Sequence, residues 1–229
     1  MCCRVKRKLR FITPESIQLG MLLALVGGFL DAYTFVCRGG VFANAQTGNL
    51  VFIGVQVYAG HFVQALLTTV PIFAFILGVF LAEIIKERWS TTSVRQAEKI
   101  ILLLEMLVLF VIGFVPSTVP HAFVTIAIAF VASVQTASFK RLVDSPYSTT
   151  MCTGNLRSAS EFAYRAIRKK DKVASVRAQR YTLVLLWFVL GSFLGAMLTL
   201  LLGVKAVWCS VAVLGIAVFL LVESPPEDR

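Results

Sequence analysis

Apolar residues fall into six long runs along the chain, separated by shorter and more polar segments. The runs cover about residues 16–37, 62–85, 100–115, 121–139, 181–202 and 206–222. A helix needs roughly 20 apolar residues to cross a hydrocarbon layer of about 30 Å, and the third and sixth runs are near the lower limit of that length. Because hydrocarbon offers no water to backbone groups, such runs are expected to be helical. The pattern therefore predicts an all-α membrane helix bundle with six transmembrane helices.

Two further segments begin at the tetrapeptide Thr-Gly-Asn-Leu, which occurs at residues 47–50 and again at 153–156. As a helix, the segment from about Gln46 to Ala59 would extend only about 21 Å, which is too short to cross a bilayer alone. It is predicted to be a half-helix or a re-entrant segment, and the second tetrapeptide is likewise predicted to begin a short half-helix. An Asn or Thr oxygen can cap the free N–H groups of such a helix, and glycine permits a sharp backbone entry. The alternative is that Thr47 and Asn49 cap a helix and have no further role.

The segment that follows Gly154 is more polar than its counterpart. Arg157, Glu161, Arg165 and Arg168 recur at helical spacing along one face, and Glu161 can pair with an arginine four residues away. This pattern favours a helix at the membrane interface or in the cytoplasm.

The duplication extends beyond the two tetrapeptides. Residues 28–35 align with 132–139, and residues 78–82 align with 191–195. The chain is therefore predicted to be one membrane domain, residues 1–229, with a first three-helix repeat at 16–116 and a second at 120–222. An odd number of spans inverts the second repeat relative to the first. Inverted repeats are common in transporters, because two equivalent halves can exchange roles and open a central site to either side.

Composition and charge agree with a membrane location. The chain is 58% hydrophobic and 15% charged, with a mean hydropathy of +0.82. Such a sequence cannot bury its apolar side chains in one soluble core. The net charge of +10 lies mainly before the first run, after the second run and between the fourth and fifth runs, which are alternate loops. The positive-inside rule then places both termini, residues 1–12 and 223–229, in the cytoplasm of a cell with the protein in its inner (plasma) membrane.

The same charge distribution argues against nucleic-acid binding, because topology alone accounts for the basic loops and no nucleic-acid module accompanies them. The five cysteines lack metal-ligand spacing. No serine-histidine, HExxH-like or clustered-aspartate motif is present. We therefore expect neither an enzyme nor a bound cofactor or metal.

Asp31 is the carboxylate that most needs an explanation, since it lies well inside the first run. A charge at that depth must pair, face water or take up a proton. Its aligned partner in the second repeat is the neutral Gln135. This asymmetry fits a carrier coupled to protons or cations, in which Asp31 titrates and Gln135 hydrogen-bonds the solute. Glu105 is ambiguous, whereas Glu83 and Lys86 are predicted to form an interfacial pair.

The candidate solute-binding residues gather around the two tetrapeptides and the aligned polar pair. Arg157 is included because it lies one turn from the proposed cavity and could bind an anionic group. The full set is Asp31, Asn44, Gln46, Thr47, Gly48, Asn49, Gln135, Thr153, Gly154, Asn155 and Arg157.

With the strings GGFLDAYTF, GGVFANAQTGNL and TTMCTGNLR in this order, the chain resembles the bacterial YoaK family of multispanning membrane proteins, also called the DUF1275 family. The resemblance covers nearly the whole chain. It implies membrane location and architecture rather than an activity. By matching motifs it adds Gly28, Gly39, Gly40, Thr149 and Thr150 to the residues of interest. Cys152 stands where the resemblance leads us to expect methionine.

The favoured hypothesis is a transporter that moves a small polar or anionic solute by alternating access, with the bilayer and that solute as its partners. A channel would share the same residues but would not be coupled to Asp31. A non-transporting scaffold or assembly protein would instead use the helix after Arg157 to bind a partner, and would tolerate Asn at position 31. The sequence leaves the solute and the oligomeric state open.

Overall fold

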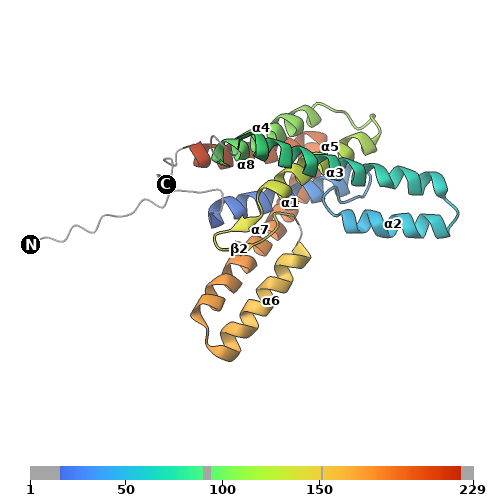
Figure 1. Ribbon diagram of the computed structural model, residues 1–229. Coiled ribbons are helices and arrows are strands. Elements are labelled where there is room, and N and C mark those ends of the chain that lie inside the picture. Colours follow the sequence, from blue (N-terminus) through green and yellow to red (C-terminus); the bar gives the residue numbers. More distant parts are fainter. Residues whose placement is uncertain (1–15, 90–93, 151, 223–229) are drawn as a thin grey trace, which may run out of the picture.

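The computed structural model describes residues 16–89, 94–150 and 152–222, so both predicted tails lie outside the described residues. The described chain is almost entirely helical, which confirms the all-α membrane bundle. The helices are α1 (Ile17–Cys37), α2 (Gln46–Tyr58), α3 (Phe62–Trp89), α4 (Val94–Ile112), α5 (His121–Ser138), α6 (Cys152–Lys169), α7 (Lys172–Leu202) and α8 (Val207–Val222), shown in Figure 1. A 3₁₀ turn, η1 (Gly203–Ala206), joins α7 to α8, and two short strands, β1 (Arg141–Leu142) and β2 (Ser145–Pro146), form a hairpin between α5 and α6.

Each of the six predicted spans coincides with a helix, but some boundaries differ. The helix α7 begins at Lys172, well before the apolar run at residue 181, because Asp171 caps it. The Oδ1 atom of Asp171 accepts hydrogen bonds from the backbone N–H groups of Val173 and Ala174 at 2.9 and 3.1 Å. The second tetrapeptide helix, α6, is also longer than a half-helix, with 18 residues against 13 in α2. Side-chain caps and ion pairs thus extend helices into polar sequence that hydropathy does not mark.

Length and hydropathy select four stretches of the described chain as candidate membrane spans. These are Ile17–Cys37, Phe62–Arg88, His121–Ser138 and the continuous stretch Lys172–Leu221, which holds both α7 and α8. The helix α4 is not among them, because its 19 residues include Arg95, Glu98, Lys99 and Glu105. The boundary within the long stretch is set by Gly203, whose φ of +60° is a conformation that glycine adopts without strain.

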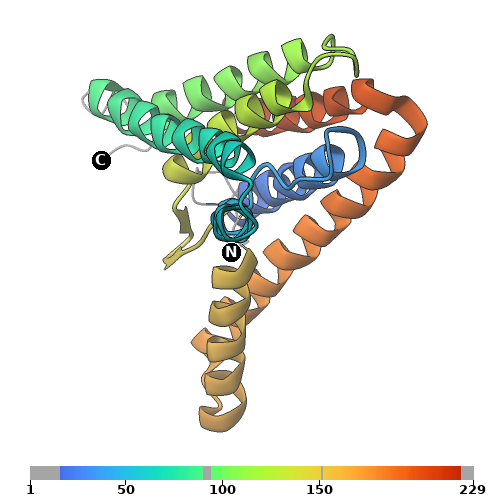
Figure 2. The ribbon, with the colours of Figure 1, turned by 90° about the vertical axis from the view of Figure 1, so that its right-hand side faces the viewer.

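The helices associate mainly across the two halves of the chain. The most extensive contacts join α1 to α7 and α3 to α5, while α2 lies along α3 and α6 lies along α7. The helix α4 contacts α5 and α8, and α8 also contacts α1. These contacts are symmetric if α1, α2, α3 and α4 are exchanged with α5, α6, α7 and α8 in that order. The contact of α1 with α7 then becomes that of α5 with α3, α2 with α3 becomes α6 with α7, and α4 with α5 becomes α8 with α1. The contact of α4 with α8 is unchanged by the exchange. Figure 2 shows α7 passing diagonally beside α1 on its way from the projecting hairpin that it forms with α6.

Glycines permit the two closest helix crossings. A Cβ atom at Gly28 would overlap the backbone oxygen of Phe188 in α7, and one at Gly191 would overlap that of Leu25 in α1. In the crossing of α3 with α5, a Cβ at Gly78 would overlap the backbone oxygen of Phe130. Small residues at such points let helix backbones approach closely in a membrane. The aligned glycines Gly78 and Gly191 therefore have the same packing role in the two crossings.

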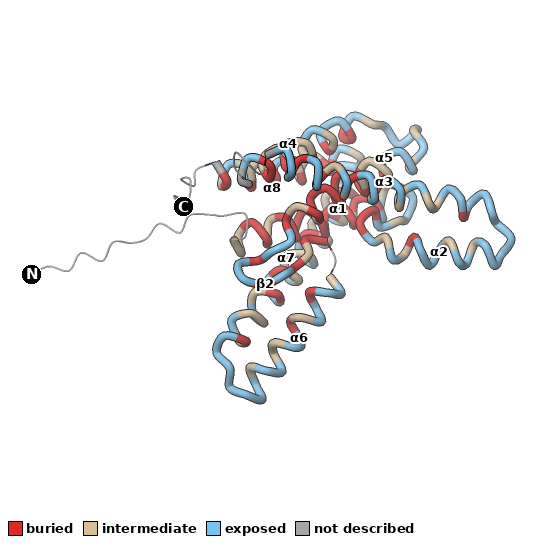
Figure 3. The backbone as a smooth tube through the Cα atoms, in the orientation of Figure 1, coloured by how far each residue is buried: buried red, intermediate tan, exposed pale blue. Residues whose placement is uncertain are grey.

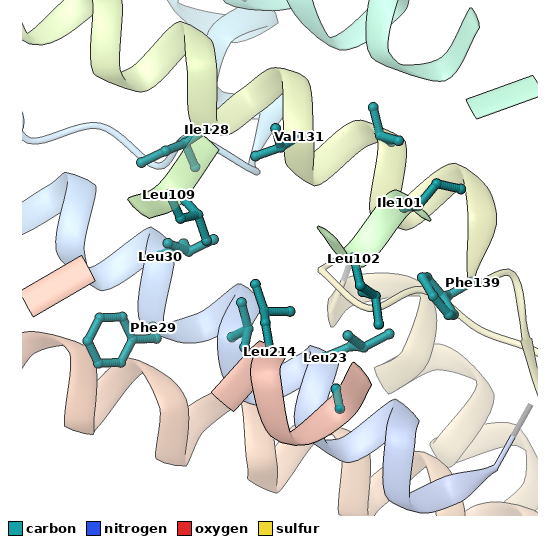
Figure 4. Packing of buried hydrophobic residues seen from close by; sticks show 14 of the residues in the cluster. Leu23, Phe29, Leu30, Ile101, Leu102, Leu109, Ile128, Val131, Phe139 and Leu214 are labelled. Atoms are coloured by element: carbon teal, nitrogen blue, oxygen red, sulfur yellow. The ribbon is translucent and has the colours of Figure 1, made fainter. Parts of the chain in front are cut away.

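The main apolar core lies between α1, α4, α5 and α8. Figure 4 shows part of it, where Leu23 and Leu30 of α1 lie near Leu102 and Leu109 of α4 and Leu214 of α8. All five side chains are almost completely buried. In contrast, most of α2 and α6 and the ends of α3 and α7 beside them are exposed, as Figure 3 shows by colour. Two helical hairpins, α2–α3 and α6–α7, thus extend from a packed centre.

Candidate functional site

Asp31 lies in α1, and the segment before α2 folds back onto it. The carboxylate is buried, and its Oδ1 atom accepts a hydrogen bond from the backbone N–H of Asn44 at 3.0 Å. The Asn44 side chain donates from Nδ2 to the backbone oxygen of Gly27 at 3.1 Å. The chain reverses here through Gly39 and Gly40, which have φ values of +93° and +72°. The loop after α1 therefore delivers Asn44 to the buried carboxylate.

The segment before α6 reaches the same part of α1. The hydroxyl oxygen of Thr136 in α5 lies 3.2 Å from that of Thr149 and 3.1 Å from that of Thr150. Thr150 packs against Gly27, where an added Cβ atom would lie 2.9 Å from its methyl group. We call Asp31, Asn44, Thr136, Thr149 and Thr150 the polar cluster. It forms where the two segments that precede α2 and α6 meet at α1 and α5.

The starts of both tetrapeptide helices lie close to this cluster. Figure 1 shows α2 and α6 leaving the centre of the molecule in different directions. Thr150, which precedes α6 by two residues, packs against Gly27, one turn from Asp31 in α1. The first residue of α2, Gln46, donates from Nε2 to the backbone oxygen of Ala43 at 2.9 Å, next to Asn44. The two helix N-termini therefore converge near one buried carboxylate.

The two tetrapeptide asparagines do not cap their helices, so that part of the prediction is wrong. Asn49 and Asn155 lie inside the first turns of α2 and α6, and the N-cap residue of α2, Ala45, forms no side-chain cap. Instead, Asn49 donates to the side chain of Gln46 at 2.7 Å. Asn155 accepts from the backbone N–H of Ser148 at 3.2 Å and donates to its backbone oxygen at 2.6 Å. Asn155 thus binds α6 to the segment that leads to the polar cluster, whereas Asn49 does so for α2 only through Gln46, whose amide binds Ala43.

The threonines and glycines of the tetrapeptides face outward. Thr47, Thr153 and Gly154 are exposed, and Gly48 is half-buried. A Cβ atom at either glycine would meet nothing within 4 Å, and neither glycine has a positive φ. Glycine is thus not needed at these positions for a sharp entry, which is a correction to the sequence-based expectation. The structure leaves all four residues without a described contact to the polar cluster.

Two other predicted site residues have partners elsewhere. Gln135 donates from Nε2 to both carboxylate oxygens of the buried Glu105, at 3.2 and 3.0 Å. This pairing gives a hydrogen-bonding partner to Glu105, whose role the sequence left ambiguous. Arg157 is exposed and forms an ion pair with Glu161 at 2.8 Å. The predicted pair of Glu83 and Lys86 is confirmed, with 2.9 Å between the Oε1 and Nζ atoms.

Arg38 is a structural residue whose burial the sequence did not predict. Its guanidinium is fully buried and donates to the Tyr33 hydroxyl at 3.0 Å and to the backbone oxygens of Val115 and Pro116 at 2.8 and 3.3 Å. Tyr33 donates in turn to the backbone oxygen of Val204. The end of α1 is thus bound to the α4–α5 and α7–α8 connections. A tyrosine five residues before an arginine at a helix end is too weak a pattern to predict this network.

The β1–β2 turn is bound to α7 by an ionic contact. Asp144 accepts from Arg177 at 2.7 Å and from Arg180 at 2.8 Å. The hydrogen bond from Arg177 lowers the pKa of the Asp144 carboxyl. This exposed contact fixes the connection between α5 and α6 and therefore the approach of Thr149 and Thr150 to α1.

The polar cluster combines one carboxylate, one amide and three hydroxyls, all of which can hydrogen-bond a small polar guest. Within the part of the chain that the structure describes, no three His, Cys, Asp or Glu side chains gather in a way that could hold a metal ion. A separate open groove lies between α6 and α7, lined by Ala163, Ala166, Ile167, Ser175, Ala178, Gln179, Thr182 and Leu183. The chemistry of the site therefore favours binding.

Comparison with known proteins places the chain in a family. It is 29% identical over 160 residues to the UPF0700 transmembrane protein YoaK of Bacillus subtilis (strain 168), covering 68% of this chain and 71% of that protein. No solved structure matches the chain. The model of the family described as "Protein of unknown function (DUF1275)" matches residues 19–220. The chain therefore belongs to the DUF1275 family, which includes a transmembrane relative.

Proposed function

We propose that this membrane protein is a carrier that moves a small polar solute by alternating access through the polar cluster. The observation that carries the proposal is the meeting of two equivalent segments at Gly27 of α1, one turn from the buried carboxylate of Asp31. Residues 39–45 bring Asn44 to Asp31, and residues 147–150 bring Thr149 and Thr150 to Thr136. Buried polar groups in a membrane protein are costly and usually mark a substrate or ion pathway.

The pairing of helices supports an inverted repeat as the basis of this mechanism. In the proposed repeat, α1–α4 corresponds to α5–α8, so the crossing of α1 with α7 corresponds to that of α5 with α3. Both crossings are extensive and both contain an aligned glycine, Gly191 or Gly78. A structure whose halves are interchangeable has two conformations of similar energy, because each half can adopt the arrangement of the other.

Irregular backbone also supports the position of the proposed site. The segments before α2 and α6 are not helical, and at membrane depth such backbone is tolerated only inside protein or beside water. The N-termini of α2 and α6 point toward the same region, as expected for interrupted helices around a transport site. In this mechanism, the hairpins α2–α3 and α6–α7 move relative to α1 and α5 and expose the cluster to one side and then the other.

Charge supports an orientation with both termini in the cytoplasm. The α6–α7 hairpin has Arg157, Arg165, Arg168, Arg177 and Arg180, whereas α2 has no charged residue. Under the positive-inside rule, the α6–α7 hairpin lies on the cytoplasmic side and the α2–α3 hairpin lies on the external side of an inner (plasma) membrane.

The proposal can be tested without knowing the solute, by measuring the access of water to the cluster. A single cysteine replaces Thr150 in a variant whose five native cysteines have been changed to serine. Proteoliposomes of known orientation are then treated with a membrane-impermeant thiol reagent added to one side or to the other. His61→Cys in the α2–α3 turn and Ile167→Cys on α6 serve as controls for the two sides, since both residues are exposed.

A carrier is expected to expose the Thr150→Cys thiol to the reagent from each side, while each control reacts from one side only. A thiol that reacts from neither side contradicts the carrier and favours a scaffold. If the reagent also crosses the membrane and labels the control on the far side, the protein is a channel rather than a carrier.

A further inference from the structure

The polar cluster contains a carboxylate that no cationic side chain of the described residues neutralises. Asp31 is 7% exposed, and within the same part of the chain it receives one hydrogen bond, from the Asn44 N–H, and forms no ion pair. Another buried carboxylate of the bundle, Glu105, has both oxygens bound by Gln135. A buried charge without a partner is strongly unfavourable, so Asp31 requires a positive charge from outside the chain or a proton.

The amide oxygen of Asn44 is a second acceptor without a donor. The residue is 4% exposed, and its Oδ1 atom has no hydrogen-bond partner within the described structure. The orientation of this amide is determined by Gly27, because a backbone oxygen can only accept and therefore faces Nδ2. Oδ1 is thus the orphan atom, and it belongs to the residue whose N–H binds Asp31. A buried acceptor left without a donor costs roughly 1–3 kcal/mol.

Further oxygens lie in the same part of the cluster. The hydroxyl of Thr136 lies 3.2 Å from that of Thr149 and 3.1 Å from that of Thr150, and the backbone oxygen of Thr149 lies beside Gly27. Hydroxyl, amide and carbonyl oxygens around a single carboxylate are the ligands of a hard cation. One negative charge matches a cation of one positive charge, whereas Ca²⁺ sites usually contain several carboxylates.

We propose that Asp31 and Asn44 form the centre of a binding site for a monovalent cationic group, with the hydroxyls of Thr149 and Thr150 as further ligands. The group is an inorganic ion such as Na⁺ or K⁺, or the ammonium head of an organic solute, because each presents one positive charge to oxygen acceptors. The inference deepens the proposed function and rests on the same cluster. It makes the solute, or the ion that is moved with it, a cation rather than an anion.

The test is a thermal unfolding series on the purified full-length protein in detergent. Sodium, potassium and methylammonium chloride are each titrated against N-methyl-D-glucamine chloride at constant ionic strength. One of the three small cations is expected to raise the unfolding midpoint with the logarithm of its concentration above its Kd, by about 3–6 °C when its concentration is ten times its Kd. The cation that gives the shift distinguishes an inorganic ion from an ammonium head.

Two substitutions link the shift to the site. Asp31→Asn keeps the shape of the side chain and removes its charge, and is expected to abolish the shift. Asp144→Asn makes the same chemical change at an exposed carboxylate bound to Arg177 and Arg180, and should leave the shift unchanged. Should Asp31→Asn not fold, Thr150→Val against Thr150→Ser is the second comparison, in which only the hydroxyl-bearing variant should retain the shift.

The inference is overturned if none of the three cations stabilises the wild-type protein, or if Asp31→Asn responds as the wild type does. The two experiments distinguish a failure of the proposed cation site from a failure of the proposed carrier function. A protein without a cation-dependent shift whose Thr150→Cys thiol still reacts from both sides remains a carrier without this site. A protein with the shift whose thiol reacts from neither side binds the cation but does not transport.

Discussion

The α2–α3 and α6–α7 hairpins begin in the same way and then present different surfaces. Both start with Thr-Gly-Asn-Leu, bury the asparagine and run beside the next helix. The exposed surface of α2 is apolar, whereas that of α6 carries most of its charged residues beside a few apolar ones. The exposed residues include Leu50, Val51, Phe52, Val55, Val57 and Tyr58 in α2, and Arg157, Glu161, Arg165, Arg168 and Lys169 in α6, where Leu156, Tyr164 and Ile167 are also exposed.

The difference between the surfaces of α2 and α6 can be located at individual aligned residues. In the register of the tetrapeptide, Val51 corresponds to Arg157 and Val55 corresponds to Glu161. The valines are 61% and 56% exposed, while the arginine and the glutamate form an ion pair four residues apart. One backbone arrangement therefore carries an apolar pair in one half and an ionic pair in the other. The difference indicates that α2 lies in lipid and that α6 lies in water or among headgroups.

The largest expected effect comes from moving the α6 charge onto α2. Val51→Arg should cost about 2.5–3.5 kcal/mol if α2 lies in hydrocarbon, because that is the cost of an arginine at the centre of a membrane helix. The reverse change, Arg157→Val, removes an exposed ion pair and should cost less than about 1 kcal/mol. The measurement is the yield of monodisperse protein in detergent together with its unfolding midpoint. Equal effects of the two changes would show that the hairpins share one environment.

The second prediction concerns the helices that complete the hairpins. Gly78→Ala and Gly191→Ala each place a Cβ atom on a backbone oxygen of α5 or α1, which cannot move without separating the helices. Overpacking of this kind costs about 1–3 kcal/mol. For a chain of 229 residues this corresponds to a fall of roughly 2–10 °C in the unfolding midpoint. The two variants should be affected alike, and a large difference between them would break the equivalence of the two crossings.

Hydropathy predicted the helices well because each apolar run has one stable conformation in a bilayer. The start of α7 was missed, since its cap, Asp171, acts through local hydrogen bonds that hydropathy does not measure. The alignment of residues 78–82 with 191–195 placed Gly78 and Gly191 at equivalent positions, but it did not predict that α1 would pair with α7 rather than with a helix of its own half. That choice depends on contacts between residues far apart in the sequence.

The candidate site was predicted in its centre but not in its contacts. Asp31 and Asn44 lie together as the motif suggested, because a loop of seven residues joins α1 to the N-cap of α2. Thr136 was not predicted, because its role depends on the two threonines that the second segment brings to it. Gln135 was predicted to face the solute, yet its amide binds Glu105, a partner on another helix.

The third prediction compares the two buried asparagines. Asn155→Ala leaves both the N–H and the oxygen of Ser148 without this partner, whereas Asn49→Ala removes a single hydrogen bond to Gln46. Each of these hydrogen bonds contributes about 1 kcal/mol, and Asn155→Ala removes two of them where Asn49→Ala removes one. The unfolding midpoint of Asn155→Ala should therefore fall further than that of Asn49→Ala. A larger fall for Asn49→Ala would mean that α2 depends on this contact more than α6 does.

The smallest expected effect is a stabilisation, at the two tetrapeptide glycines. Neither Gly48 nor Gly154 has a positive φ or a neighbour that a Cβ atom would meet, so alanine should raise the stability of each helix by about 0.5–1 kcal/mol. Both halves nevertheless have glycine at this position, beside a cluster that must open in the proposed carrier. We expect each variant to unfold at a higher temperature and to slow the reaction of Thr150→Cys from one side of the membrane.

Gly54 provides a matched control within α2. A Cβ atom there also meets nothing within 4 Å, but the residue lies farther along the helix from the polar cluster. Gly54→Ala should therefore give the same stabilisation without changing the reaction of the Thr150→Cys thiol. If Gly48→Ala and Gly154→Ala behave like this control, the tetrapeptide glycines have no role in opening the site. If only those two slow the reaction, the close approach that glycine permits occurs in a conformation in which α2 or α6 has moved.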